Sequence, residues 1–170
     1  VDRFDNNDPN LQPYSPSQST VRDAEQGHTF QGGKLKGITR RLAYIKGLGC
    51  STIWLSPILK NRLDKKDSYH GYGIQDFLEV DPRFGTLEDL QELTSAAHAI
   101  GMYVVLDVVL NHAGDVWGYP DDQPYYFYQD QQFPFGFWRE KDPQAGLQDD
   151  DAVWPQELQS ADAFKRRGQI

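Results

Sequence analysis

The sequence predicts an α/β fold built on a parallel sheet. Apolar residues recur every three or four positions over residues 35–48 and again over 86–101, as in amphipathic helices. A short apolar run follows each of these two stretches. With a possible strand end at the start of the chain, the order is strand, helix, strand, helix, strand. That order makes two βαβ units, and such units form parallel sheets.

The first elements are predicted from turn-forming residues and from the spacing of apolar residues. Residues 1–33 are rich in Asn, Pro and Gly and predict a loop, preceded by the end of a strand at residues 1–4. A helix then carries an apolar face formed by Leu35, Ile38, Leu42, Ile45 and Leu48. It ends at Gly49. The β-branched and aromatic run at residues 51–55, closed by Pro57, predicts a buried strand.

The next elements repeat the pattern. Residues 58–85 predict a polar loop. Thr86 and Asp89 have the spacing of a capping box and open a second helix, which closes at Gly101. Its apolar stripe consists of Leu87, Leu90, Leu93 and Ala97. The run at residues 102–109 is nearly all apolar, which predicts a strand buried on both faces.

Residues 113–170 show no sustained period. They carry many aromatic residues between positions 125 and 138 and an acidic run at 149–151. An insertion of this length behind a strand is typical of a small subdomain or a functional loop. The aromatic cluster is expected to form the core of that subdomain in preference to a ligand site.

Composition excludes some classes of function. The 170 residues contain 17 Lys and Arg against 25 Asp and Glu, a net charge of −8. With a pI near 4.9 and no basic run, the chain lacks the footprint that nucleic acid requires. No apolar run is long enough to span a bilayer, so no membrane partner is expected. Cys50 is the single cysteine, which excludes an intrachain disulfide. Because the chain opens on Val1 without a signal sequence, we expect an excised segment.

Asp107 is the first candidate for a functional site. A carboxylate within an apolar strand costs several kcal/mol unless it is paired or hydrogen-bonded. Asn111 and His112 follow it at the carboxyl edge of the predicted sheet, where parallel α/β folds bind ligands. The alternative is a structural carboxylate that holds a neighbouring loop. Strict alternation does not bring Asp107 and His112 to one face, so a turn after Val109 would be needed.

Two loops suggest ligand contacts. His70 and Tyr72 flank Gly71, and an aromatic ring beside hydrogen-bonding groups suits a sugar, although such a pair can also serve packing alone. Three alternating oxygen-bearing residues in the first loop could supply ligands for Ca²⁺ or could simply form turns; they are Asn6, Asp8 and Asn10. The sequence shows no nucleophile motif, phosphate loop or zinc spacing, and no identifiable carboxylate pair.

The order of motifs nevertheless resembles the α-amylase family of glycoside hydrolases. The residues that carry the resemblance are Asp2-Arg3-Phe4, Ile53-Trp54-Leu55-Ser56-Pro57, Tyr69-His70-Gly71-Tyr72 with Gln75-Asp76, Asp81-Pro82-Arg83-Phe84-Gly85-Thr86 and Asp107-Val108-Val109-Leu110-Asn111-His112. The similarity runs almost continuously over residues 1–112.

The resemblance implies a (β/α)₈ barrel with a subdomain inserted after the third strand. Residues 1–112 would be the N-terminal part of the barrel, about three βα units, and residues 113–170 the incomplete insertion. The implied activity is hydrolysis of α-1,4-glucosidic bonds in starch-like glucans or maltooligosaccharides, with retention of configuration. The catalytic carboxylates would lie on later strands beyond Ile170, so this segment alone would be inactive and would need the remainder of the barrel.

The resemblance also implies roles for individual residues. Tyr72 would form a stacking platform for the sugar next to the cleaved bond. His70 and His112 would hydrogen-bond the hydroxyls of that sugar, and Asp107 would lie beneath it and orient the catalytic groups. Asn111 corresponds to a ligand of a structural Ca²⁺.

Two departures argue against calcium. The Leu-Pro-Asp-Leu type run that usually completes the Asn111 site is absent. In the N-terminal loop, Lys34 follows the double glycine where an acid is expected, and its charge would repel a cation.

Other functions fit parts of the same pattern. A transglycosylase or isomerase would use the same covalent intermediate. A non-catalytic relative would act as a binding or transporter-associated module, but it would not need the sugar-site residues. A stand-alone carbohydrate-binding segment would use the aromatic insertion.

Overall fold

A computed structural model describes residues 1–5, 30–63, 68–114, 117–118, 137–138, 153–159 and 163. The chain divides into two compact units, which are described one at a time. The first unit comprises Val1–Ile58, Lys65–His70 and Val80–Val108, and the second comprises Leu59–Asp64, Gly71–Glu79 and Val109–Ile170.

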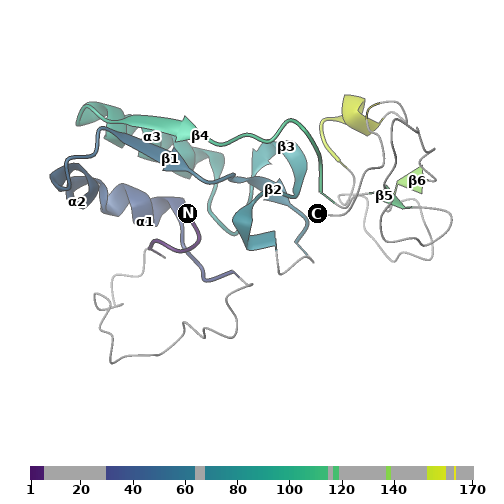
Figure 1. Ribbon diagram of the computed structural model, residues 1–170, viewed down its shortest axis with the longest axis horizontal. Coiled ribbons are helices and arrows are strands. Elements are labelled where there is room, and N and C mark those ends of the chain that lie inside the picture. Colours follow the sequence, from purple (N-terminus) through teal and green to yellow (C-terminus); the bar gives the residue numbers. More distant parts are fainter. Residues whose placement is uncertain are drawn as a thin grey trace. The chain divides into compact units, whose positions relative to one another are not determined.

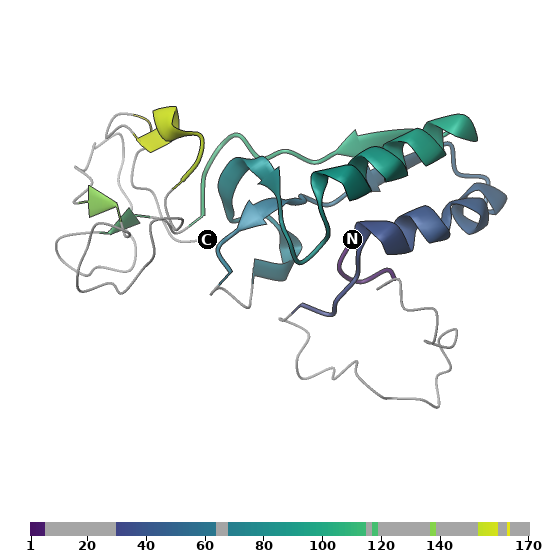
Figure 2. The same ribbon diagram turned by 180° about the vertical axis from the view of Figure 1, so that it is seen from behind.

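The first unit is built around two parallel strands. Strand β1 (Thr52–Leu55) pairs with β4 (Tyr103–Leu106), so that Leu55 lies opposite Leu106. Helix α3 (Leu87–Ala99) precedes β4 and packs along the strand pair (Figures 1 and 2). The predicted parallel β–α–β arrangement is therefore confirmed for this pair. The predicted strand at 102–109 is shorter than expected.

The predicted capping box at the start of α3 is confirmed. The Thr86 hydroxyl accepts a hydrogen bond from the Asp89 backbone N–H at 3.3 Å, and Asp89 Oδ2 accepts one from the Thr86 N–H at 3.1 Å. These two bonds satisfy donors that the first helical turn leaves without intrahelical partners. Of the predicted stripe, Leu93 and Ala97 are buried, whereas Leu87 is exposed. Leu87 occupies the first helical position, at the edge of the packed face.

The predicted helix over residues 35–48 is in fact two short helices. Helix α1 (Leu35–Arg40) ends at Arg41, and α2 (Leu42–Gly47) begins directly after it. Arg40 and Arg41 both donate to the Asp5 carboxylate, at 2.6 and 2.7 Å. Neighbouring residues of a regular helix point about 100° apart. The break at Arg41 lets the side chains of Arg40 and Arg41 both reach the Asp5 carboxylate.

The hydrophobic core of the first unit lies between these helices and the strand pair. Its buried members are Leu35, Ile38, Leu42, Leu55, Ile58, Phe84, Leu93, Ala97 and Met102. Helix α1 packs against α3 and supplies the first members. The apolar periodicity of 35–48 therefore identified the correct face, even though the helix is interrupted.

One face of the strand pair is exposed, so the prediction that the strand at 102–109 is buried on both faces is wrong for this structure. Trp54 is 72% exposed and Tyr103 is 70% exposed, and Val105 lies on the same face. The opposite face carries Ile53 and Leu55, which pack on the core. Among the described residues, helices cover only that second face.

The start of the chain forms a turn, so the predicted strand end at residues 1–4 is wrong. The Phe4 N–H donates to the Val1 carbonyl at 3.1 Å. The buried Asp2 carboxylate accepts hydrogen bonds from the Gln31 and Gly32 N–H groups at 2.8 and 3.0 Å. The hydrogen bonds of Asp2 hold the start of the chain to residues 31–32. In a strand, the backbone groups of this segment would instead pair with a neighbouring strand.

The second unit contains two strands that the sequence analysis assigned to a polar loop, and that prediction is corrected here. Strand β2 (Leu59–Asn61) pairs with β3 (Ile74–Val80). Trp154 adds a parallel bridge to β3: its N–H donates to the Gln75 carbonyl, and its carbonyl accepts from the Phe77 N–H, both at 2.9 Å. This bridge attaches residues 153–159 to the second unit.

Two further short strands belong to this unit. Strand β5 (Trp117–Gly118) pairs antiparallel with β6 (Phe137–Trp138), and a 3₁₀ helix spans Gln156–Gln159. Most of the aromatic cluster at 125–138 lies outside the described residues. The division into a barrel part, 1–112, and an inserted subdomain, 113–170, stays a prediction. No helix in the described part of the chain is long and apolar enough to cross a membrane.

Candidate functional site

Two loops of the second unit meet at the residues predicted to contact a sugar. The imidazole Nε2 of His112 lies 3.0 Å from the backbone carbonyl oxygen of Tyr72. The Tyr72 side chain is 40% exposed. An exposed aromatic ring and an imidazole thus lie on loops that contact each other directly.

The neighbours of His112 select one protonation form of its ring. A carbonyl oxygen only accepts hydrogen bonds, so Nε2 must carry the proton that it shares with Tyr72. The Asn111 Nδ2 group, a donor, lies 3.4 Å from His112 Nδ1, which therefore accepts. The Tyr72 carbonyl therefore places a proton on Nε2. Because the contact from Asn111 is long, a hydroxyl group of a ligand could replace Asn111 as the hydrogen-bond donor to Nδ1.

Glycine brings the two loops close together. The Gly114 N–H donates to the Ile74 carbonyl at 2.7 Å. A Cβ atom at position 114 would lie only 2.5 Å from the Gly73 carbonyl oxygen. Real side chains do not approach a backbone oxygen this closely, so residue 114 has to be glycine for this packing. The close approach fixes where the loop carrying His112 passes the loop carrying Tyr72.

Asn61 is a residue of this unit that the sequence analysis did not single out. It is fully buried at the end of β2, and its Nδ2 group donates to the carbonyls of Leu59 and Gly71. A lone Asn in a polar stretch is typical of a turn, so the sequence carried no signal for this role.

His70 lies in the first unit, in a 3₁₀ helix (Ser68–His70). Its ring meets the Tyr69 ring edge to face, with 5.5 Å between the centroids. The Arg3 guanidinium lies 4.4 Å above the Tyr69 ring and 3.2 Å from the Asp2 carboxylate. The aromatic contact of His70 is therefore with Tyr69, and the roles predicted for the pair of His70 and Tyr72 stay a prediction.

Asp107 also lies in the first unit, directly after β4. Its backbone N–H donates to the Leu55 carbonyl at 3.2 Å, which extends the β1–β4 pairing by one bond. The side chain is half-buried. Asp107 therefore stands at the carboxyl end of two parallel strands, as the sequence predicted, which is the edge where such sheets carry ligands.

The predicted calcium sites stay a prediction, because most of their ligands lie outside the described residues. Among them, no group of three or more His, Cys, Asp and Glu side chains could hold a metal ion. Asn111 lies beside His112, with its amide nitrogen toward the ring. The other predicted ligands, Asn6, Asp8 and Asn10, lie outside the described residues.

Comparison with known proteins identifies the family. Residues 1–164 match the family model for the alpha amylase catalytic domain. An alpha-amylase of Streptomyces lividans is 48% identical over 112 residues, which cover 62% of this chain and 12% of that protein. The chain belongs to the α-amylase family.

Solved structures agree with this assignment. An Anoxybacillus alpha-amylase has a TM-score of 0.55 and 42% identity, covering 71% of this chain and 24% of its own. The alpha-amylase from Geobacillus thermoleovorans was solved in complex with acarbose. It has a TM-score of 0.51 and 40% identity, and the match covers 65% of this chain and 26% of that chain. The predicted fold class, the N-terminal portion of the family's (β/α)₈ barrel, is confirmed. The chain spans about a quarter or less of these relatives.

Proposed function

We propose that the whole protein is a glycoside hydrolase that cleaves α-1,4-glucosidic bonds of starch-like glucans or maltooligosaccharides. Membership of the α-amylase family supports the class of reaction. Matched proteins carry the names neopullulanase, amylopullulanase and maltase as well as alpha-amylase, so the family alone leaves the bond and chain length open. The acarbose complex of one neighbour supports a carbohydrate ligand.

The contact between His112 and Tyr72 carries the proposal. The exposed Tyr72 ring offers an apolar face for the C–H face of a glucose unit. His112 Nδ1, whose contact with Asn111 is long, is available to accept a hydrogen bond from a sugar hydroxyl. His70 as a second hydroxyl contact and Asp107 beneath the sugar are also part of the proposal, and their roles rest on the resemblance alone.

The proposed chemistry is a two-step displacement with retention. A carboxylate attacks the anomeric carbon while a carboxylic acid protonates the departing glycosidic oxygen; water then breaks the covalent glycosyl intermediate, and the second group acts as base. The resemblance assigns these carboxylates to later strands. In this proposal, residues of the present chain bind and orient the sugar.

The test uses the full-length gene product with maltoheptaose. Replacement of Tyr72 by Ala is expected to lower kcat/KM by roughly tenfold or more, because the stacking surface is lost, whereas Tyr72→Phe keeps most of it. Tyr44→Ala, at an exposed tyrosine of α2, serves as the matched control and should leave kcat/KM unchanged. An unchanged kcat/KM in Tyr72→Ala would contradict the proposal.

The same assay separates hydrolysis from its closest rival. A hydrolase yields only products shorter than maltoheptaose. A transglycosylase passes the glycosyl intermediate to a sugar hydroxyl and yields products longer than the donor.

A further inference from the structure

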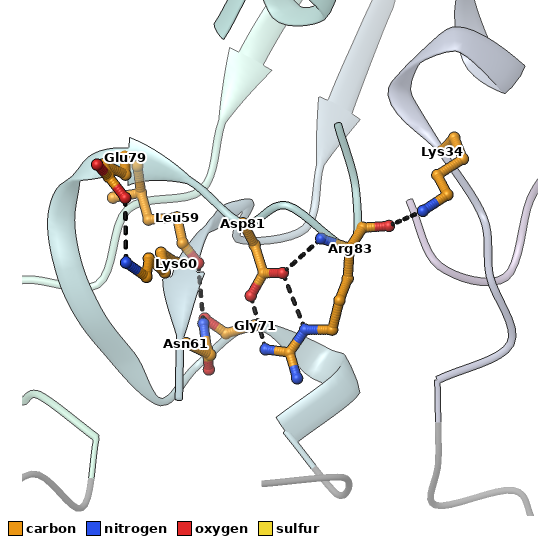
Figure 3. A network of polar contacts seen from close by, with 8 residues as sticks. All are labelled: Lys34, Leu59, Lys60, Asn61, Gly71, Glu79, Asp81 and Arg83. Carbon is orange, nitrogen blue, oxygen red and sulfur yellow. Dashed lines mark hydrogen bonds and ion pairs between the residues drawn. The ribbon is translucent and has the colours of Figure 1, made fainter. Parts of the chain in front are cut away.

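Asn61 holds the peptide group that leads into Tyr72. Figure 3 shows the Asn61 amide between two backbone carbonyls of its own unit. Its Nδ2 group donates to Leu59 O at 2.9 Å and to Gly71 O at 3.1 Å. Asn61 is 0% exposed. A primary amide carries two N–H donors, and here both point to backbone oxygens.

The position of the Gly71 carbonyl determines how the backbone enters Tyr72. The carbonyl belongs to the planar peptide unit that joins Gly71 to Tyr72, so fixing this oxygen fixes the orientation of the whole plane up to the Tyr72 Cα. Gly71 itself has a φ of +81°, in the left-handed region that residues other than glycine rarely adopt. Glycine lets the chain take this conformation without steric cost, and the Asn61 hydrogen bond fixes the peptide plane that follows it.

Tyr72 is held from both sides. The peptide group before it is bound by Asn61 through the Gly71 carbonyl, and the peptide group after it is bound by His112 through the Tyr72 carbonyl. Both hydrogen bonds lie within the second unit. Together they fix the backbone on either side of the residue whose ring is exposed.

We propose that Asn61 is a positioning residue for the sugar-binding pair of Tyr72 and His112. This inference rests on the proposed function, because it assigns Asn61 an effect on the same glucan site. Asn61 is fully buried and does not touch the sugar; it acts by orienting the Gly71–Tyr72 peptide. Its loss would leave the buried Gly71 carbonyl without this donor and would free the peptide plane to rotate.

The test is a double-mutant cycle in the full-length protein, with maltoheptaose as substrate. Asn61→Ala is made in the wild type and in the Tyr72→Ala variant, and kcat/KM and melting temperature are measured for each. We expect Asn61→Ala to lower kcat/KM by roughly tenfold in the wild type and by less than about twofold when the Tyr72 ring is already absent. The melting temperature should fall equally in both backgrounds.

A matched control separates positioning from loss of stability. Val153→Ala removes two methyl groups from a fully buried residue of the same unit without touching the Asn61 hydrogen bonds. It should lower the melting temperature but leave kcat/KM unchanged in both backgrounds. An equal loss of kcat/KM from Asn61→Ala in the two backgrounds would overturn the positioning role while leaving the proposed function intact.

The proposed function fails separately, if Tyr72→Ala itself leaves kcat/KM unchanged; Asn61 then has no sugar contact to position, and both ideas fall. Should Asn61→Ala not yield folded protein, Gly71→Ala disturbs the same peptide from its backbone side. The expected result is the same dependence on the Tyr72 background. A background-independent loss would again overturn the inference.

Discussion

His112 Nε2 lies 3.0 Å from the backbone carbonyl oxygen of Tyr72, a residue 40 positions earlier in the chain. The contact joins the loop after β4 to the loop before β3. It ties the orientation of an imidazole to the backbone of an exposed aromatic residue. Small displacements of either loop should therefore affect the proposed sugar contact before they affect the core.

The first prediction concerns the close approach of these loops. Gly114→Ala would place a Cβ 2.5 Å from the Gly73 carbonyl oxygen, so the loop carrying His112 must move. We expect kcat/KM for maltoheptaose to fall between roughly 10- and 100-fold, the range typical of a misplaced contact group.

Gly47→Ala is the matched control. Gly47 is the last residue of α2, and a Cβ there would meet nothing within 4 Å. Alanine favours a helix by up to about 1 kcal/mol over glycine, so this variant should keep full activity and unfold at the same or a higher temperature. Equal activity in the two variants would show that the close approach does not matter for the site.

The second prediction concerns the buried ion pair of the first unit. Asp81 is 0% exposed, and its carboxylate accepts hydrogen bonds from the Arg83 guanidinium at 2.9 and 2.7 Å (Figure 3). The backbone carbonyl of Arg83 accepts a hydrogen bond from Lys34 Nζ at 2.6 Å. Asp81→Asn should lower the free energy of unfolding by about 2 kcal/mol, because the buried carboxylate loses its charge-assisted hydrogen bonds while the partly exposed Arg83 keeps access to water.

Urea denaturation measures this loss, with Glu79→Gln as the control. Glu79 pairs with Lys60 at 3.1 Å but is largely exposed. Breaking such a pair costs below about 1 kcal/mol. If both variants lost the same free energy of unfolding, burial would not distinguish the two ion pairs, and this prediction would be wrong.

The third prediction concerns the start of α3. Thr86→Ala removes the hydroxyl that accepts from the Asp89 N–H and should cost about 1 kcal/mol of unfolding free energy. Thr94→Ala in the same helix removes a hydroxyl that donates to the Leu90 carbonyl, a group that the helix already satisfies. That loss should be smaller. Thermal denaturation of both variants checks the order.

The fourth prediction concerns pH. The pKa of Glu88 lies below its ordinary value of 4.5, because its carboxylate accepts hydrogen bonds from its own backbone N–H and from the Thr86 side chain. A lowered folded-state pKa adds stability above the unfolded pKa, and this stability is lost as the pH falls through the folded value. Glu88→Gln should therefore be less stable than wild type at about pH 6, and this difference should shrink as the pH falls below 4.5 through the lowered folded-state pKa. A difference that grew on acidification would contradict this account.

The sequence predicted the elements that have regular apolar patterns. The stripe that ends with Leu93 and Ala97 and the run before Asp107 both became the expected helix and strand, and the Thr86–Asp89 spacing became a real capping box. Periodicity could not show the break at Arg41, because the ion pairs with Asp5 come from a segment distant in sequence.

The pattern failed where polar residues are buried. Strand β3 begins with three buried residues, two of which are the polar Gln75 and Asp76, and β2 is three residues long and ends in the buried Asn61. Neither strand shows an alternation of apolar and polar residues, so both were assigned to a loop. The residues that hold the candidate site are thus the ones that hydrophobic patterns cannot detect.

The candidate site was predicted by ordered motifs and not by spacing. Alternation along the strand did not bring Asp107 toward His112, and no pattern linked His112 to Tyr72. The structure supplies that link through the loop after β4 and the glycine at position 114. Asn61 was recognised as part of the candidate site only from its burial and its two hydrogen bonds in the structure.

The most direct test of the central claim is the stereochemistry of the first product. The full-length protein is incubated with maltoheptaose, and the new reducing ends are followed by proton NMR before mutarotation. A retaining α-glucan hydrolase releases the α-anomer first, and this signal should weaken strongly in Tyr72→Ala. Release of the β-anomer, or no cleavage by a folded full-length protein, would contradict the account.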